Sequence, residues 1–183
     1  MDNGESSYRR FLAGDDEGLF DIISTYRAGL ILYLNSFVQN IRTAEELAED
    51  TFAELAISCP KFSGRSSFKT WLYAIGRNIT AKYIRKHAKL SIVPLESQEN
   101  HADEEDLEGN YIKSEQKRSM HNAMHRLKAE YRQVLYLSFF EGFSNAEPAE
   151  IMHKSKRQIE ALLYNAKKAL KNELERSGFE YEE

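Results

Sequence analysis

The sequence predicts an all-α fold, with two small helical domains joined by a flexible acidic linker, the second being a helix-turn-helix domain. Proline and glycine are scarce, at 3 and 9 of 183 residues, and long stretches carry apolar side chains at helical spacing. One intervening stretch is acidic and poor in apolar residues. We therefore expect domains at 1–92 and 113–175, a linker at 93–112 and a frayed tail at 176–183.

The chain is expected to begin with a short helix. Apolar spacing places it at residues 8–14, where Gly14 stops it. Asp15 or Asp16 then caps a longer helix over residues 17–38, which has an apolar side and is assigned to the core.

A third helix is expected to start at a capping box formed by Thr43 and Glu46 and to run to Ser58. The single cysteine, Cys59, is interpreted as a buried small hydrophobic residue rather than a redox sensor. The outward face of this helix is acidic, which indicates either solubility or a docking surface for a basic partner. Its positions are Glu46, Glu49, Asp50, Ala53 and Glu54.

The fourth helix, over residues 68–89, carries the main functional signal. From Lys61 to Lys89 there are eight Lys or Arg and no Asp or Glu, although the protein's net charge is −4. Aromatic residues and an asparagine alternate with this charge, which favours binding of a nucleic-acid strand over a merely solvated basic face. The expected polar face holds Lys69, Tyr73, Arg77, Asn78, Lys82 and Arg85.

The second domain is expected to hold two packing helices, over 113–127 and 129–141, then a short helix and a long one. Capping boxes at residues 144–147 and 155–158 open the last two helices. This order is typical of a helix-turn-helix domain, with a plain helical bundle as the alternative. Its outward basic positions are Lys154, Lys156, Arg157, Lys167, Lys168 and Lys171.

Taken in order along the chain, the two predicted domains and the linker between them resemble the extracytoplasmic-function group of bacterial RNA polymerase sigma factors. The residues that resemble the family's minus-ten helix are Phe68, Thr70, Trp71, Leu72, Tyr73, Ile75, Asn78 and Arg85. Those that resemble its polymerase-docking helix are Ala44, Glu45, Glu46, Leu47 and Phe52. Those that resemble the start of its second domain are Leu127, Arg132, Val134, Leu135, Glu141, Gly142, Ser144, Glu147, Ala149 and Glu150.

The resemblance implies a protein that directs core RNA polymerase to promoter DNA and starts its opening. It implies that the acidic face of the third helix binds polymerase, and that a flipped base enters a pocket formed by Lys61, Phe62, Ser63 and Asn78. The implied minus-ten contacts are Lys61, Phe62, Ser63, Arg65, Lys69, Arg77, Asn78, Lys82 and Arg85. An inhibitory anti-sigma factor is the further partner that the resemblance implies.

The expected upstream-element contacts lie in and just before the last helix: Lys154, Lys156, Arg157, Glu160, Ala161, Tyr164, Asn165 and Lys168. Glu160 and Asn165 stand where the family usually has basic residues, and Pro148 replaces an apolar one. Glu160 can accept a hydrogen bond from a cytosine amino group. Weak upstream binding and a protein partner are the alternatives.

Two other interpretations are a free-standing helix-turn-helix regulator and a helical adaptor without DNA contact. The first predicts tight duplex binding by the protein alone, and the acid-free basic stretch argues against the second. An enzyme is disfavoured, because His121 and His125 lack further ligands for a metal and no catalytic motif is present. We expect no cofactor, no metal, no membrane insertion and a cytoplasmic location.

Overall fold

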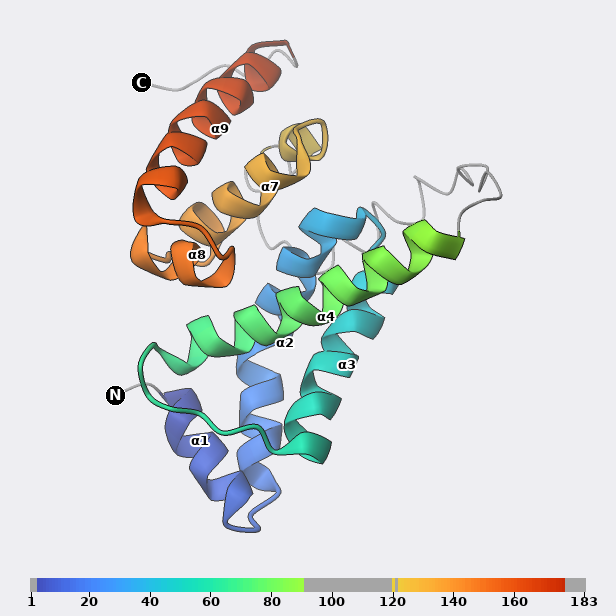
Figure 1. Ribbon diagram of the computed structural model, residues 1–183, viewed down its shortest axis with the longest axis vertical. Coiled ribbons are helices and arrows are strands. Elements are labelled where there is room, and N and C mark those ends of the chain that lie inside the picture. The colour runs from blue at the N-terminus through green and yellow to red at the C-terminus, as the bar shows by residue number, and fades with distance from the viewer. Residues whose placement is uncertain (1–2, 91–119, 121, 177–183) are drawn as a thin grey trace.

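The computed structural model describes residues 3–90, 120 and 122–176. The predicted linker, nearly all of the predicted tail and part of the predicted helix over 113–127 lie outside these residues. Every described element is helical, as the sequence predicted (Figure 1). The N-terminal unit consists of α1 (Asn3–Leu12), α2 (Glu17–Val38), α3 (Ile41–Ser58) and α4 (Phe68–Leu90). The C-terminal unit consists of α7 (Ala129–Leu135), the π-helical turn η1 (Tyr136–Phe140), α8 (Ala146–Ile151) and α9 (Lys156–Arg176).

Helices α2, α3 and α4 pack together in the N-terminal unit, and α1 lies against the first half of α2 (Figure 1). The side of α3 opposite its acidic face lies in the core, where Ala44, Leu47 and Leu55 are almost completely buried. Aromatic rings connect the first helix of the unit to the last. The centroid of the Tyr8 ring on α1 lies 5.6 Å from that of Phe68 and 5.4 Å from that of Trp71, both on α4. This burial of aromatic area stabilises the start of α4.

The C-terminal unit lies against α4 and α2 rather than apart from them (Figure 1). Tyr73, which the helical spacing placed on the polar face of α4, is fully buried. Its ring stacks on Tyr33 of α2 at 5.4 Å and meets the edge of Phe143 at 5.5 Å. The prediction for Tyr73 was wrong because a single-helix pattern cannot show a second unit that covers the opposite face.

Helix α1 and the start of α3 differ from their predicted positions, whereas α2 has the predicted bounds and α3 ends at Ser58 as predicted. Helix α1 spans Asn3–Leu12 rather than residues 8–14, and Gly14 adopts a left-handed φ of 94° in the turn that follows. Asp15, not Asp16, supplies a side-chain acceptor to the first turn of α2, at 3.1 Å from the Glu17 nitrogen. Helix α3 begins at Ile41 instead of at the expected Thr43–Glu46 capping box.

Asn40 is the residue that caps α3. Its backbone is extended and its Oδ1 accepts a hydrogen bond of 2.9 Å from the Thr43 nitrogen. Thr43 therefore lies inside the first turn, because burial of Ile41 draws the helix start toward the core. At the other end, Cys59 adopts a left-handed φ of 43° as the C-cap and is exposed, so the expectation of a buried cysteine was wrong.

The predicted helix over 129–141 is divided into α7 and η1, and Gly142 follows with a φ of 68°. Glu147 accepts a 2.9 Å hydrogen bond from the Ser144 nitrogen ahead of α8. Pro148 is the third residue of α8, a position in the first turn where its missing N–H costs nothing.

The second predicted capping box in this unit forms completely. The Ser155 nitrogen donates to Gln158 Oε1 at 2.8 Å, and the Gln158 nitrogen donates to Ser155 Oγ at 3.2 Å. A short helix, a turn and a long capped helix therefore follow one another, which is the predicted helix-turn-helix order. Among the described helices, none has the length and apolar content needed to cross a membrane.

The cap assignment for α3 gives a direct prediction. Asn40→Ala is expected to lower the free energy of unfolding by about 1 kcal/mol, because the Thr43 N–H loses its acceptor at the helix start. Thr43→Ala, which keeps that backbone donor and its Asn40 acceptor, is expected to cost less than half as much. Urea denaturation followed by circular dichroism measures both values, and a larger loss for Thr43→Ala would contradict the assignment.

Candidate nucleic-acid interface

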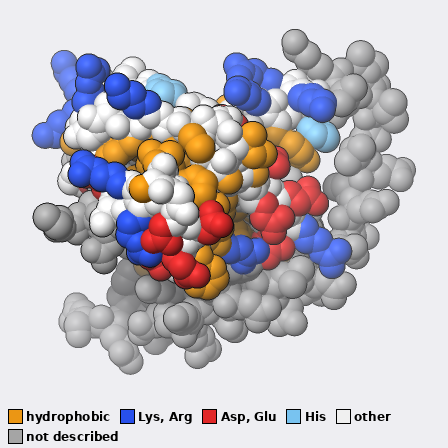
Figure 2. Space-filling model, turned by 90° about the horizontal axis from the view of Figure 1, so that it is seen from below, with side chains coloured by type: hydrophobic (Ala, Val, Ile, Leu, Met, Phe, Trp, Pro, Cys, Tyr) orange, Lys and Arg blue, Asp and Glu red, His pale blue; other side chains and the backbone are white. Residues whose placement is uncertain are grey.

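The basic stretch of the sequence forms the loop before α4 and one side of that helix. Its members in the loop and in the later turns of α4 are well exposed, as expected for side chains that meet a polyanion. These exposed residues are Lys61, Ser63, Arg65, Lys82 and Arg85. Arg77 is half-buried. Viewed from the lower end of Figure 1, an apolar patch has Lys and Arg side chains along one edge and a mixture of Lys, Arg, Asp and Glu side chains along the other (Figure 2).

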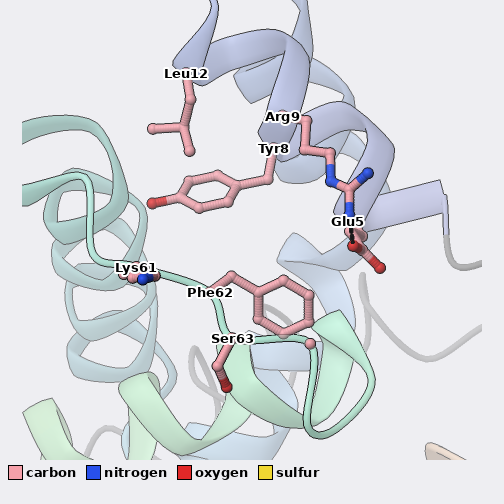
Figure 3. Close-up of a pocket in the computed structure, with 8 residues that line it drawn as sticks. Glu5, Tyr8, Arg9, Leu12, Lys61, Phe62 and Ser63 are labelled. Carbon is pink, nitrogen blue, oxygen red and sulfur yellow. Dashed lines mark hydrogen bonds and ion pairs between the residues drawn. The ribbon is translucent and has the colours of Figure 1, made fainter.

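A pocket of about 210 Å³ opens between this loop and α1. Lys61, Phe62 and Ser63, three of the four residues expected to form a base pocket, line it from the loop side. Helix α1 forms the opposite wall (Figure 3). Its contributing side chains are Glu5, Tyr8, Arg9 and Leu12. No local pattern in the sequence predicts this second wall, because only folding brings Tyr8 of α1 beside Pro60, 52 residues later in the chain.

The pocket has an aromatic wall and a charged rim. The Phe62 ring lies 5.1 Å from Trp71, between centroids, and is held half-buried by α4. Arg9 and Glu5 form an ion pair at the opposite wall (Figure 3). A flat ring surface beside a cationic hydrogen-bond donor and an anionic acceptor is suited to a planar heteroaromatic ligand.

Tyr8 connects α1 to the pocket loop. Its hydroxyl donates a 2.8 Å hydrogen bond to the carbonyl oxygen of Pro60, the residue before Lys61. Burial raises the pKa of Tyr8 to about 12, and the neighbouring Cys59 thiol adds to the effect. The neutral phenol therefore fixes the base of the loop to α1.

Two predicted DNA-binding residues, Asn78 and Lys69, lie outside the pocket and contact the C-terminal unit. Asn78 is absent from the pocket wall, and its Oδ1 lies 3.2 Å from Nε2 of His153 in the turn after α8. Lys69 Nζ lies 2.7 Å from Glu141 Oε2. The structure thus separates Asn78 from Lys61, Phe62 and Ser63, with which the expected base pocket had grouped it.

The acidic face of α3 is open. All five of its predicted positions, Glu46, Glu49, Asp50, Ala53 and Glu54, are exposed. Glu49 makes a long ion pair of 3.7 Å with Arg27 of α2. This weak contact leaves the face accessible to a partner.

The predicted contact positions of α9 are also exposed. They are Lys156, Arg157, Glu160, Ala161, Tyr164, Asn165 and Lys168. Lys154 is half-buried, because its Nζ pairs with Glu130 of α7 at 2.9 Å. Tyr164 is 71% exposed, which is unusual for a tyrosine and places a ring on the outer surface of the long helix.

Comparison with known families decides between the remaining interpretations. Residues 22–90 match the family of Sigma-70 region 2, and residues 117–170 match Sigma-70, region 4. RNA polymerase sigma factor YlaC of Bacillus subtilis is 26% identical over 166 residues, covering 88% of this chain and 94% of its own. The ECF sigma factor SigW of the same species is 23% identical, over 88% of this chain and 91% of its own.

The chain belongs to the extracytoplasmic-function sigma factors. This sigma factor is therefore a transcription initiation factor and not an enzyme. Its fold is shared by CnrH, solved in complex with the cytosolic domain of CnrY, at a TM-score of 0.67 and 18% identity over 96% of this chain and 99% of that one. RpoE, solved with the anti-sigma factor NepR from Bartonella quintana, also gives 0.67, at 23% identity over 84% and 94%.

The contact between Tyr8 and the pocket loop gives a prediction about the stability of the sigma factor. Tyr8→Phe is expected to lower the free energy of unfolding by about 1 kcal/mol at neutral pH, because the Pro60 carbonyl loses its donor. Since folding raises the pKa of Tyr8 from 10.0 to about 12, the unfolded chain ionises first. The advantage of the wild type should shrink as pH rises from 10 toward 12.

Urea denaturation of both proteins across this pH range measures the difference. The comparison cancels the ionisation of all other groups, which the two chains share. A difference that stays constant from pH 8 to pH 12 would contradict the assignment.

Proposed function

We propose that this sigma factor recognises and opens the minus-ten element with α4 and the preceding loop, and that the pocket between the loop and α1 holds one base turned out of the stack. The observation that carries this proposal is the position of the pocket. It adjoins an acid-free basic helix and has an aromatic wall, Phe62 on Trp71, together with the rim residues Glu5 and Arg9. Phosphate contacts would fix the strand while the pocket selects the base.

The proposal divides the work among residues by their position. Phe62 would stack on the flipped base, while Lys61, Ser63 and Arg65 contact its sugar and phosphates. The basic and polar residues of α4 would follow the strand away from the pocket. They are Lys69, Arg77, Asn78, Lys82 and Arg85.

The other surfaces receive roles that complete promoter recognition. The acidic face of α3 would bind core polymerase, and the exposed side of α9 would contact the upstream element, with Glu160 accepting from a cytosine amino group. This division corresponds to domains at 1–92 and 113–175 joined by an acidic linker at 93–112. An inhibitory anti-sigma factor and a cytoplasmic location complete the proposal, the former supported by the partners named for the CnrH and RpoE structures.

Run-off transcription tests the proposed function. The purified protein is mixed with bacterial core RNA polymerase and fragmented DNA from its host, and the new starts are mapped. Discrete starts that share two upstream elements are expected. No starts and no co-elution with core polymerase would instead favour a free-standing regulator or an adaptor.

The stacking role of Phe62 gives a specific prediction. Phe62→Ala is expected to reduce open-complex formation about tenfold or more, because base–aromatic stacking contributes about 1–3 kcal/mol per base. Co-elution with core polymerase should be unchanged. Permanganate footprinting of the melted strand measures opening.

Phe139→Ala is the matched control for Phe62→Ala. Phe139 lies on η1 and is 52% exposed. Lys167 Nζ lies 5.3 Å from the centroid of the Phe139 ring. Its removal should leave opening within twofold of the wild type. Equal losses in the two variants, or wild-type opening by Phe62→Ala, would remove the pocket from the mechanism.

Lys82 and Arg85 are expected to bind phosphates without selecting sequence. Reversing both charges, Lys82→Glu with Arg85→Glu, should weaken polymerase-dependent DNA binding on all promoters alike. The slope of log affinity against log salt should fall by about 1–2, since each lost phosphate contact removes nearly one counterion.

The control for this charge reversal is Arg126→Glu with Lys128→Glu, which makes the same change in net charge at two exposed residues before α7. Filter binding over a series of salt concentrations compares the two double variants. A loss confined to one promoter sequence would show instead that Lys82 and Arg85 read bases.

A further inference from the structure

Lys69 of α4 is held by Glu141 at the end of η1. Its Nζ lies 2.7 Å from Glu141 Oε2 and donates a 3.0 Å hydrogen bond to the Glu141 carbonyl oxygen. The two side chains are only 28% and 11% exposed. The ammonium also lies 4.7 Å from the centroid of the Phe143 ring of the C-terminal unit and 5.7 Å from that of Tyr73 on α4.

The hydroxyl groups at the start of α4 make the same kind of contact with α8. Thr70 Oγ1 donates to Glu147 Oε1 at 3.1 Å, and Ser67 Oγ reaches the same oxygen at 3.4 Å. Ser66 Oγ donates to Glu150 Oε1 at 2.8 Å. Three carboxylates of one unit therefore face four donors of the other, from Ser66, Ser67, Lys69 and Thr70.

The surface of α2 is shaped to admit the first of these carboxylates. A Cβ at Gly29 would lie 2.5 Å from Glu141 Oε1 and 2.6 Å from the Tyr73 hydroxyl, closer than side chains tolerate. Glycine at this helical position thus permits the close approach of Glu141. Burial, reinforced by the Glu141 charge, raises the pKa of Tyr73 well above its ordinary value.

We propose that Glu141, Glu147 and Glu150 act as an intramolecular substitute for promoter phosphates, so that the C-terminal unit blocks the start of α4 until the two units separate. This inference rests on the proposed function of α4. The donors concerned are an ammonium and hydroxyl groups next to the pocket loop, the same kinds of group that bind DNA phosphate oxygens. A donor occupied by a carboxylate is not available to a phosphate.

The arrangement in which the carboxylates contact α4 is here termed the closed arrangement. It leaves the acidic face of α3 exposed, including Glu46 and Glu54. Core polymerase can therefore dock on α3 before α4 is uncovered. DNA engagement then follows polymerase binding, because polymerase must hold the two units apart to keep Lys69 accessible.

The proposal is tested on the full chain with Glu147→Gln and Glu150→Gln combined. Glutamine keeps a side-chain oxygen for the Ser144 nitrogen, so the start of α8 stays capped while both negative charges are removed. Binding of the protein alone to a promoter-length duplex with a melted minus-ten region is measured by fluorescence anisotropy. We expect about tenfold tighter binding, which corresponds to roughly 1.4 kcal/mol.

A second measurement reports the separation of the units. Donor and acceptor dyes are placed on Cys59, which is exposed at the end of α3, and on Asn172→Cys, an exposed position of α9. Energy transfer should fall in the double variant, and it should fall in the wild type when core polymerase is added.

The matched control is Asp16→Asn with Glu17→Gln, which removes two charges at exposed positions before and at the start of α2. It should change neither DNA binding nor energy transfer. Equal gains in the control and the double variant, or tighter binding without a change in energy transfer, would reduce the effect to net charge and overturn the proposal. Unchanged binding by the double variant would overturn it as well.

The measurements distinguish a failure of this proposal from a failure of the proposed function on which it rests. If the wild type supports run-off transcription with core polymerase but the double variant binds DNA as the wild type does, the carboxylates do not substitute for promoter phosphates. The proposed promoter function would then still stand. Absence of wild-type transcription would refute the promoter role itself.

Discussion

Tyr33 of α2 lies between two tyrosines that come from different parts of the chain. Its ring is fully buried and stacks on Tyr73 of α4 at 5.4 Å and on Tyr136 of η1 at 6.4 Å. These contacts fix α4 on α2 and bring the C-terminal unit onto both. The polar contacts of α4 with Glu141 and Glu147 depend on them, since short hydrogen bonds require backbones already held at the right separation.

Arg132 adds a polar contact to this aromatic one. The guanidinium is buried, and its Nε donates a 2.9 Å hydrogen bond to the Ser36 carbonyl oxygen near the end of α2, where helix carbonyls lack partners. Burial lowers the pKa of Arg132 but leaves the residue charged. The C-terminal unit thus supplies a guanidinium, that of Arg132, to the negative C-terminal end of α2 in the N-terminal unit. The units meet through both apolar area and satisfied polar groups, so their separation needs a partner that offsets both.

Local signals in the sequence were enough for the helical fold and for part of the candidate site. The Ser155–Gln158 box, the buried face of α3 and the exposed basic residues of α4 and its loop were predictable, because each depends on neighbours within about one or two helical turns. The start of α3 was placed wrongly because Asn40 competes with Thr43 for the same role, and burial of Ile41 decided the matter.

By itself, the sequence determined the all-helical class and the segregation of the basic residues, since composition and periodicity are properties of the linear chain. The sigma-factor family followed from the resemblance of motif residues and from the family matches, not from composition or periodicity. Only the tertiary structure decided that α1 forms a wall of the pocket and that Tyr73 is buried. It also decided that Asn78 contacts His153 rather than the pocket loop. These features join residues that lie far apart in the sequence, and such proximity arises from packing, on which local patterns carry no information.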